Sequence, residues 1–168
     1  MSTQVDTQLV RAHGIAALVT LLIAISFGII VSLQFIAPDI TGSALPLGWG
    51  RLRYAHTQGI MLGWLGNAFF AFMYHAVPVL TGRPVTSKRI GLWLFGIWNF
   101  AVMLPGWILV LAGVSQPLEW AEFPLITDLF IVVALALAAV QFLPPFFRRS
   151  LEKLYVSSWY IIGALVFT

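Results

Sequence analysis

The chain has 168 residues, of which 60% are hydrophobic and only 9% are charged, and its mean hydropathy is +0.95. So little polar surface excludes a water-soluble globular protein. The absence of cysteine removes disulfides, thiolate metal sites and iron–sulfur clusters. The net charge of +3 and the pI near 9.7 would suit a nucleic-acid partner, but the basic residues are placed as in a membrane protein. The composition therefore predicts an integral membrane protein that binds no nucleic acid.

Four apolar segments are long enough to cross a membrane as helices, because about 30 Å of hydrocarbon requires roughly 20 apolar residues. They cover about 14–37, 55–80, 90–114 and 123–147. A fifth apolar segment begins near Ser157 and reaches Thr168, which is too short to span. The sequence predicts an all-α polytopic bundle, with four full transmembrane helices plus the start of a fifth in a single membrane domain, 1–168. We expect it to be the N-terminal part of a larger bundle or one piece of a split subunit.

The basic residues predict how the helices are oriented. Seven of the nine fall at one side of the predicted spans, namely Arg11, Arg83, Lys88, Arg89, Arg148, Arg149 and Lys153. The positive-inside rule then places the N-terminus in the cytoplasm and the loops 38–53 and 115–122 outside. Arg51 and Arg53 break this rule at the outer mouth of the second span. Ordinary loop charges would explain them, but their closeness to His56 favours a function.

The second span combines His56 with a stripe of small residues. Gly59, Gly63 and Gly66 follow the histidine at offsets of three, seven and ten, so all four lie within one helical stripe. Close helix–helix packing explains the G-x-x-x-G spacing of the first two glycines. A flat porphyrin needs the same absence of side chains, and a histidine one turn away can supply an axial bond to its iron. Both alternatives stay open for the stripe.

The other polar residues of the spans suggest further alternatives. About 28 Å of helix separates His56 from His75, so these two histidines cannot share a metal. His13 and His75 could hold a haem at the inner interface, as in a small four-helix cytochrome, although interfacial or hydrogen-bonding roles suit them better. Asn67 and Asn99 lie at membrane depth, where interhelical hydrogen bonds are a better interpretation than a proton route.

Three separated motifs resemble one known family. The first is Gly50-Arg-Leu-Arg-Tyr-Ala-His56-Thr followed by Gly66-Asn67-Ala68, which is similar to the second transmembrane helix of the catalytic subunit of haem-copper oxidases of the cbb type, the C family. The second, Ser115-Gln116-Pro-Leu-Glu119-Trp-Ala121-Glu122 with Asp128 six residues on, resembles the outward loop before helix four. The third, Leu154-Tyr155-Val156-Ser157-Ser158-Trp159, resembles the entry to helix five. The resemblance covers roughly 33–168.

The resemblance implies roles for residues around the second span. His56 matches one axial ligand of the low-spin haem b, and Arg51 and Arg53 match basic groups near the haem propionates. Gly59, Gly63 and Gly66 would then form the packing face of the haem. Glu122 matches a family carboxylate associated with calcium, a cation that prefers oxygen ligands. Tyr54 stands where these oxidases often have proline, which departs from the pattern of the subfamily.

The resemblance also implies a larger assembly in the bacterial inner (plasma) membrane. The second axial histidine of haem b, the high-spin haem and the copper site belong to later helices, and no histidine follows His75. The expected partners are the remaining helices of the catalytic subunit, and cytochrome c-type oxidase subunits as electron donors. The implied activity is a terminal oxidase that reduces oxygen to water. Two alternatives are the catalytic subunit of nitric oxide reductase, whose second helix is similar, and a haem-free structural or transport subunit.

Overall fold

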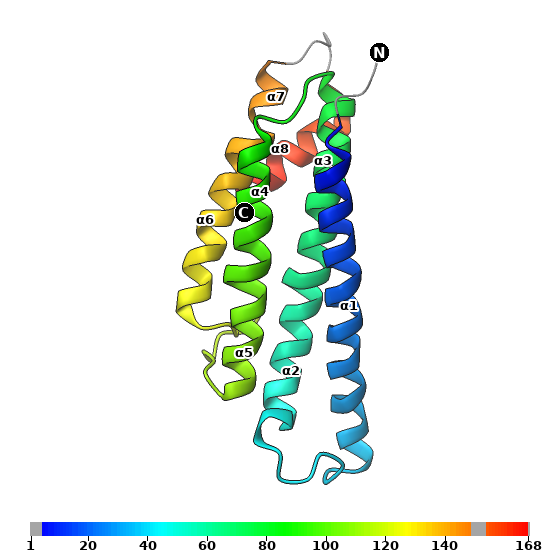
Figure 1. The fold of residues 1–168 in the computed structure, drawn as a ribbon, viewed down its shortest axis with the longest axis vertical. Coiled ribbons are helices and arrows are strands. Elements are labelled where there is room, and N and C mark those ends of the chain that lie inside the picture. The colour runs from blue at the N-terminus through cyan, green and yellow to red at the C-terminus, as the bar shows by residue number, and fades with distance from the viewer. Residues whose placement is uncertain (1–4, 149–153, 168) are drawn as a thin grey trace.

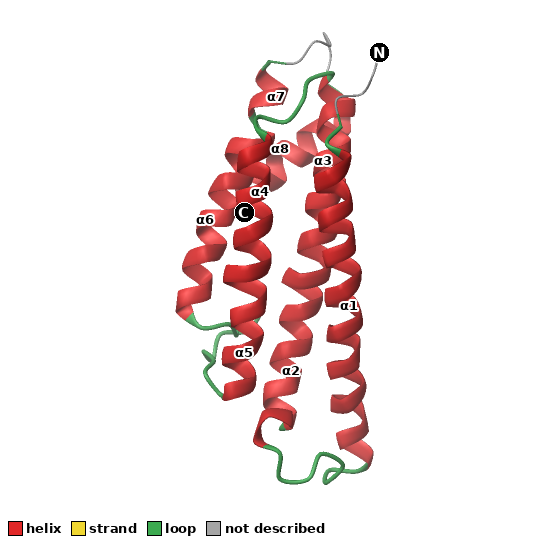
Figure 2. Ribbon diagram, in the orientation of Figure 1, coloured by secondary structure: helices red, strands yellow, loops and turns green. Residues whose placement is uncertain are grey.

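A computed structural model describes residues 5–148 and 154–167, and shows long helices that run side by side (Figure 1; Figure 2). Among the described residues, four helical stretches have the length and apolar composition to cross a membrane: Thr7–Ile36, Trp49–Thr81, Lys88–Ala112 and Leu125–Phe147. The predicted all-α bundle with four full spans is confirmed. The first two spans begin several residues earlier than predicted, because polar residues that precede each apolar run are also helical.

The elements follow one another in a simple up-and-down order. The first span is α1 (Thr7–Ile36), and a short 3₁₀ turn, Leu45–Leu47, precedes the second. The second contains α2 (Trp49–Gln58), a π-helical segment η2 (Gly59–Gly66) and α3 (Asn67–Thr81). The third contains α4 (Lys88–Gly96), a π-helical segment η3 (Ile97–Met103) and α5 (Leu104–Ala112). The fourth contains α6 (Leu125–Phe142) and α7 (Pro144–Phe147), and α8 (Val156–Phe167) is a shorter apolar helix.

Local sequence signals explain where several helices begin and end. The carboxylate of Asp6 accepts hydrogen bonds from the first turn of α1, and the Ser87 hydroxyl does the same for α4. Gly82 and Gly113, with φ of +65° and +97°, follow α3 and α5 in the left-handed conformation that glycine adopts most easily. Capping groups therefore fix the ends of the second and third spans.

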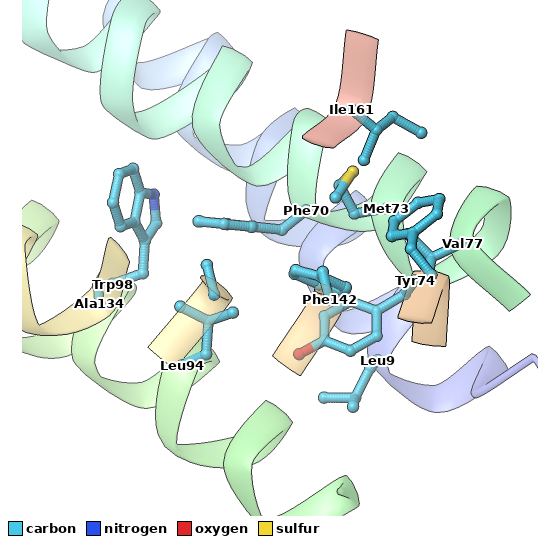
Figure 3. Close-up of a cluster of buried hydrophobic side chains, with 12 residues drawn as sticks. Leu9, Phe70, Met73, Tyr74, Val77, Leu94, Trp98, Ala134, Phe142 and Ile161 are labelled. Atoms are coloured by element: carbon cyan, nitrogen blue, oxygen red, sulfur yellow. The ribbon is translucent and has the colours of Figure 1, made fainter. Parts of the chain in front are cut away.

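The larger cluster of buried apolar side chains brings together residues from segments far apart in the sequence (Figure 3). It joins residues from six helices and η3: Leu9, Phe70, Met73, Tyr74, Val77, Leu94, Trp98, Ala134, Ala138, Phe142, Phe146 and Ile161. The rings of Tyr74 and Phe142 meet edge-on with centroids 4.8 Å apart, an arrangement that aromatic pairs favour. Ile161 of α8 packs into this cluster, so the fifth helix is part of the bundle.

A polar network crosses the bundle next to this cluster. His13 Nδ1 lies 2.8 Å from Asn67 Oδ1. The amides of Asn67 and Asn99 bond to each other at 2.9 and 3.1 Å. The prediction of interhelical hydrogen bonds for these asparagines is confirmed. His13 is fully buried whereas His75 is exposed, so the two histidines do not line a common open site.

The basic residues predicted to be cytoplasmic gather at one end of the bundle. Lys88 Nζ donates to Gln8 Oε1 at 2.7 Å, and Arg83 Nε donates to the Arg148 carbonyl oxygen at 2.9 Å. Figure 1 shows the start of α1, the loop after α3 and α7 at this same end. Arg149 and Lys153 lie outside the described residues. The assignment of this end to the cytoplasm stays a prediction.

Candidate functional site

His56 lies in the last turn of α2, and its imidazole is held against α1. Its Nδ1 is 2.8 Å from the carbonyl oxygen of Ala24. A carbonyl oxygen can only accept, so Nδ1 carries the hydrogen, and Nε2 is the ring nitrogen left to bind a metal. Histidines that bind metals are commonly oriented in this way, with the second ring nitrogen donating to a backbone carbonyl. The histidine is therefore in the tautomer that a metal ligand at Nε2 requires.

Gly28 of α1 gives the imidazole its space. A Cβ at Gly28 would lie 2.7 Å from Cε1 and Nδ1 of His56, closer than real Cβ contacts allow. The ring also lines an open and largely apolar groove beside α1, together with Ile25, Gly28, Ile29, Ser32 and Leu33. The reasoning from sequence missed Gly28 because it considered glycines of the second span alone. A glycine within an otherwise bulky apolar run was the available signal.

Arg51 and Arg53 point toward different neighbours. Arg51 Nη1 donates to the Leu111 carbonyl oxygen at 2.9 Å, close to the C-terminal end of α5, where helix carbonyls carry partial negative charge. The Arg53 guanidinium carbon lies 4.6 Å from the Tyr54 ring centroid and 5.8 Å from that of Trp49, so it makes cation–π contacts. Both side chains are half-buried. The structure thus places two cations N-terminal to His56 in α2, without pairing either with a carboxylate among the described residues.

Trp107 of α5 forms a hydrogen bond to the turn of α2 that contains His56. Its Nε1 donates to the Ala55 carbonyl oxygen at 2.9 Å, and only 9% of its side chain is exposed. Its ring meets Phe27 edge-on with centroids 5.9 Å apart. Since Ala55 directly precedes His56, this bond holds the histidine's own backbone.

Glu122 is buried in the loop between α5 and α6, with 2% of its surface exposed. Its carboxylate accepts a hydrogen bond from the Gln58 side-chain amide. Glu119 is exposed, and the Asp128 carboxylate accepts from the Gln116 amide. Within 5–148 and 154–167, no group of three or more histidine, cysteine or acidic residues could hold a metal ion. A calcium ion takes six to eight oxygen ligands, so Glu122 would need ligands from elsewhere.

The glycine stripe of the second span contacts other helices of this chain. A Cβ at Gly59, Gly63 or Gly66 would approach a neighbouring side chain to between 2.6 and 2.9 Å. The neighbours are Ala24 and Trp107 at Gly59, Thr20 and Met103 at Gly63, and Trp98 at Gly66. Close helix–helix packing therefore describes these glycines in the structure. Their role as a packing face for haem stays a prediction.

Comparison with known proteins identifies the family. The family model for cytochrome c and quinol oxidase polypeptide I matches residues 8–168. The chain belongs to this family. The resemblance to haem-copper oxidase catalytic subunits is thereby confirmed, and the segment matched to polypeptide I includes His56, Arg51, Arg53 and Glu122.

Three relatives of this polypeptide I segment are bacterial. The Cbb3-type cytochrome c oxidase subunit CcoN1 of Stutzerimonas stutzeri is 25% identical over 167 residues, which cover 99% of this chain and 35% of the relative. Cytochrome c oxidase subunit 1 of Rhodobacter capsulatus is 25% identical over 161 residues, which cover 94% of this chain and 30% of the relative. A cytochrome c oxidase subunit 1 homolog of Agrobacterium tumefaciens (strain T37) is 25% identical over 141 residues, which cover 83% of this chain and 25% of the relative. The chain thus spans at most about a third of the length of these curated relatives.

Proposed function

We propose that this chain supplies His56 as one axial ligand of a low-spin haem b in the catalytic subunit of a terminal oxidase. The observation that carries the proposal is the fixed tautomer of His56, whose Nδ1 donates to the Ala24 carbonyl oxygen. Nε2 is then the nitrogen available to iron. Gly28 supports the proposal because the absence of its side chain makes room for the ring.

The residues around His56 fit a haem b. The groove along α1 is apolar, as a porphyrin ring requires, and Arg51 and Arg53 supply positive charge on its outer side, suited to carboxylates. When bound, a six-coordinate low-spin haem carries electrons and has no open position for substrate. His56 would orient the haem, and the two arginines would offset the charge of its propionates. His13 is bonded to Asn67 and His75 is exposed at the other end of the second span, so a second axial histidine would come from beyond residues 1–168.

The remaining parts of the activity belong to the whole assembly. We assign the copper site, the high-spin haem and the reduction of oxygen to water to the rest of the catalytic subunit, in the bacterial inner membrane. Cytochrome c-type subunits would supply electrons. The relatives described above are named as cytochrome c oxidase subunits, which supports the oxidase over a nitric oxide reductase. A calcium ion at Glu122 would require Gln58 to release the carboxylate that it now binds.

Replacing His56 by alanine in the intact assembly tests this function. We expect the absorption bands of the low-spin haem to disappear from the reduced-minus-oxidised spectrum, because no other described side chain occupies that position beside Gly28. His75→Ala is the matched control, since His75 is exposed on α3 of the same span and should leave the spectrum unchanged. A His56→Ala assembly that keeps its low-spin haem bands would contradict the proposal.

A further inference from the structure

Two hollows meet at the basic end of the bundle, where the loop after α3 packs against the end of α6 and α7 (Figure 1). The first has a volume of about 380 Å³, and its lining includes Arg83, Thr86, Pro144 and Arg148. The second has a volume of about 360 Å³, and its lining includes Val140, Leu143, Phe147 and again Pro144 and Arg148. Because two residues line both, the hollows form one continuous surface with a basic part and an apolar part.

Hydrogen bonds hold the basic part in shape. Arg83 Nε donates to the Arg148 carbonyl oxygen at 2.9 Å. Thr86 Oγ1 donates to the Val140 carbonyl oxygen at 2.8 Å. The Thr86 backbone N–H donates to the Gln141 carbonyl oxygen at 3.2 Å. The loop is therefore fastened to α6 and α7 at both of its ends. The arginine bond uses Nε, and the two terminal nitrogens of the guanidinium play no part in it.

The apolar part faces outward along the fourth span. Val133, Val140 and Phe147 lie seven residues apart, on one side of α6 and α7, and are 46%, 51% and 77% exposed. Side chains of this kind on a membrane-spanning helix face either lipid or another helix. Next to them, Arg83 and Arg148 are both exposed at the level where the span ends. The surface thus presents a cationic end and an apolar track, in the order of a lipid headgroup and its chain.

We propose that this surface binds one anionic phospholipid, with its phosphate between Arg83 and Arg148 and an acyl chain along Val140 and Phe147. Guanidinium groups bind phosphate through charge-assisted hydrogen bonds. Basic pockets between helices at the cytoplasmic side of membrane proteins recognise anionic headgroups in this way. A free phosphate ion would leave the apolar track uncovered, so the lipid is the occupant that matches both parts. The site is separate from the residues around His56.

Lipid binding to the intact assembly tests the proposal. The purified, delipidated assembly is titrated with phosphatidylglycerol or phosphatidylcholine, and bound lipid is counted by native mass spectrometry. We expect the double variant Arg83→Gln/Arg148→Gln to lose affinity for phosphatidylglycerol by about fivefold for each charge removed, or about 25-fold in total. Affinity for phosphatidylcholine, whose phosphate charge is offset by its choline cation, should fall by clearly less than that for phosphatidylglycerol. An unchanged affinity of the double variant for phosphatidylglycerol would overturn the proposal.

Two further variants separate this site from a general effect of charge or folding. Arg89→Gln removes an exposed charge from the same end of the bundle without lining either hollow, and should bind phosphatidylglycerol as the native chain does. Val140→Trp fills the apolar track and keeps both arginines, so long-chain phosphatidylglycerol should bind several-fold more weakly. Equal weakening by Arg89→Gln contradicts the site. Displacement of the lipid by inorganic phosphate at equal concentration would make it a site for soluble anions, and would also contradict the proposal.

Discussion

At the scale of single residues, His56 depends on two neighbours from α1. The Ala24 carbonyl fixes the tautomer of the ring, and Gly28 leaves the volume that the ring fills. The sequence could identify His56, because a histidine beside two arginines at the mouth of a span is unusual and costly. It could not identify its two neighbours, since they lie about 30 residues earlier and meet the ring only through the packing of α1 against α2.

Gly28→Ala tests this dependence directly. The added methyl group would lie 2.7 Å from two ring atoms of His56, so the imidazole must move or α1 must shift. Overpacking of this kind costs about 1–3 kcal/mol. We expect a shifted or weakened low-spin haem band in the assembly, measured by optical spectroscopy at the same protein concentration.

Gly14→Ala is the control for that substitution. Gly14 lies on the same helix, and a Cβ there would meet nothing within 4 Å. It should leave the haem bands unchanged. Identical spectra for Gly28→Ala and the native assembly would show that the close approach of this glycine to the ring is irrelevant to haem binding.

At the scale of elements, side-chain hydrogen bonds join α2 to the third span and to the loop that follows it. Arg51, Ala55 and Gln58 recur along one stripe of this helix and are bonded to Leu111, Trp107 and Glu122. The limits of the spans were predictable, because hydropathy is a property of consecutive residues. The fold of the 113–124 loop was not, because the burial of Glu122 depends on a partner 64 residues earlier in the chain.

The glycine stripe shows the limit of reasoning from a single helix. Gly59, Gly63 and Gly66 share a stripe by their spacing, and that part of the prediction depends only on helix geometry. Which partner fills the space beside them depends on how α1 and the third span are rotated around η2. The structure fills it with side chains from these helices. The spacing alone could not separate helix packing from a cofactor face.

Trp107→Phe tests the bond that holds the turn containing His56. Phenylalanine keeps most of the apolar ring but loses the hydrogen bond to the Ala55 carbonyl oxygen. Removal of such a bond costs about 1 kcal/mol. We expect the midpoint temperature for loss of the haem absorbance to fall by about 2–4 °C.

Trp93→Phe provides the comparison, since Trp93 is 68% exposed on α4. Its replacement should change the midpoint temperature by less than Trp107→Phe does. If both substitutions lower it equally, the bond from Trp107 has no special part in holding the site.

At the scale of the whole molecule, the charge distribution and the exposed apolar surface agree on a membrane bundle. Between 22% and 39% of the apolar window of each span is buried within the chain. The remaining surface is available to lipid and to further helices of the subunit. Composition and loop charges are enough to predict a membrane bundle. They do not predict that α8 packs into the buried cluster through Ile161, which only the structure shows.

Cysteine labelling tests the predicted orientation, because the chain contains no cysteine of its own. Ser43 lies in the exposed loop before α2, and Pro84 lies in the exposed loop after α3. A membrane-impermeant maleimide added to intact spheroplasts should label Ser43→Cys, and should label Pro84→Cys only after permeabilisation. The reverse pattern would place the basic end outside the cell and contradict the positive-inside assignment.

An experimental structure of the intact oxidase, with its haems resolved, tests the central claim most directly. The account predicts that Nε2 of His56 lies at bonding distance from a haem iron, while Nδ1 keeps its hydrogen bond to the Ala24 carbonyl oxygen. A haem iron with two axial ligands from other residues, and His56 facing lipid, solvent or protein without a tetrapyrrole beside it, would contradict the account.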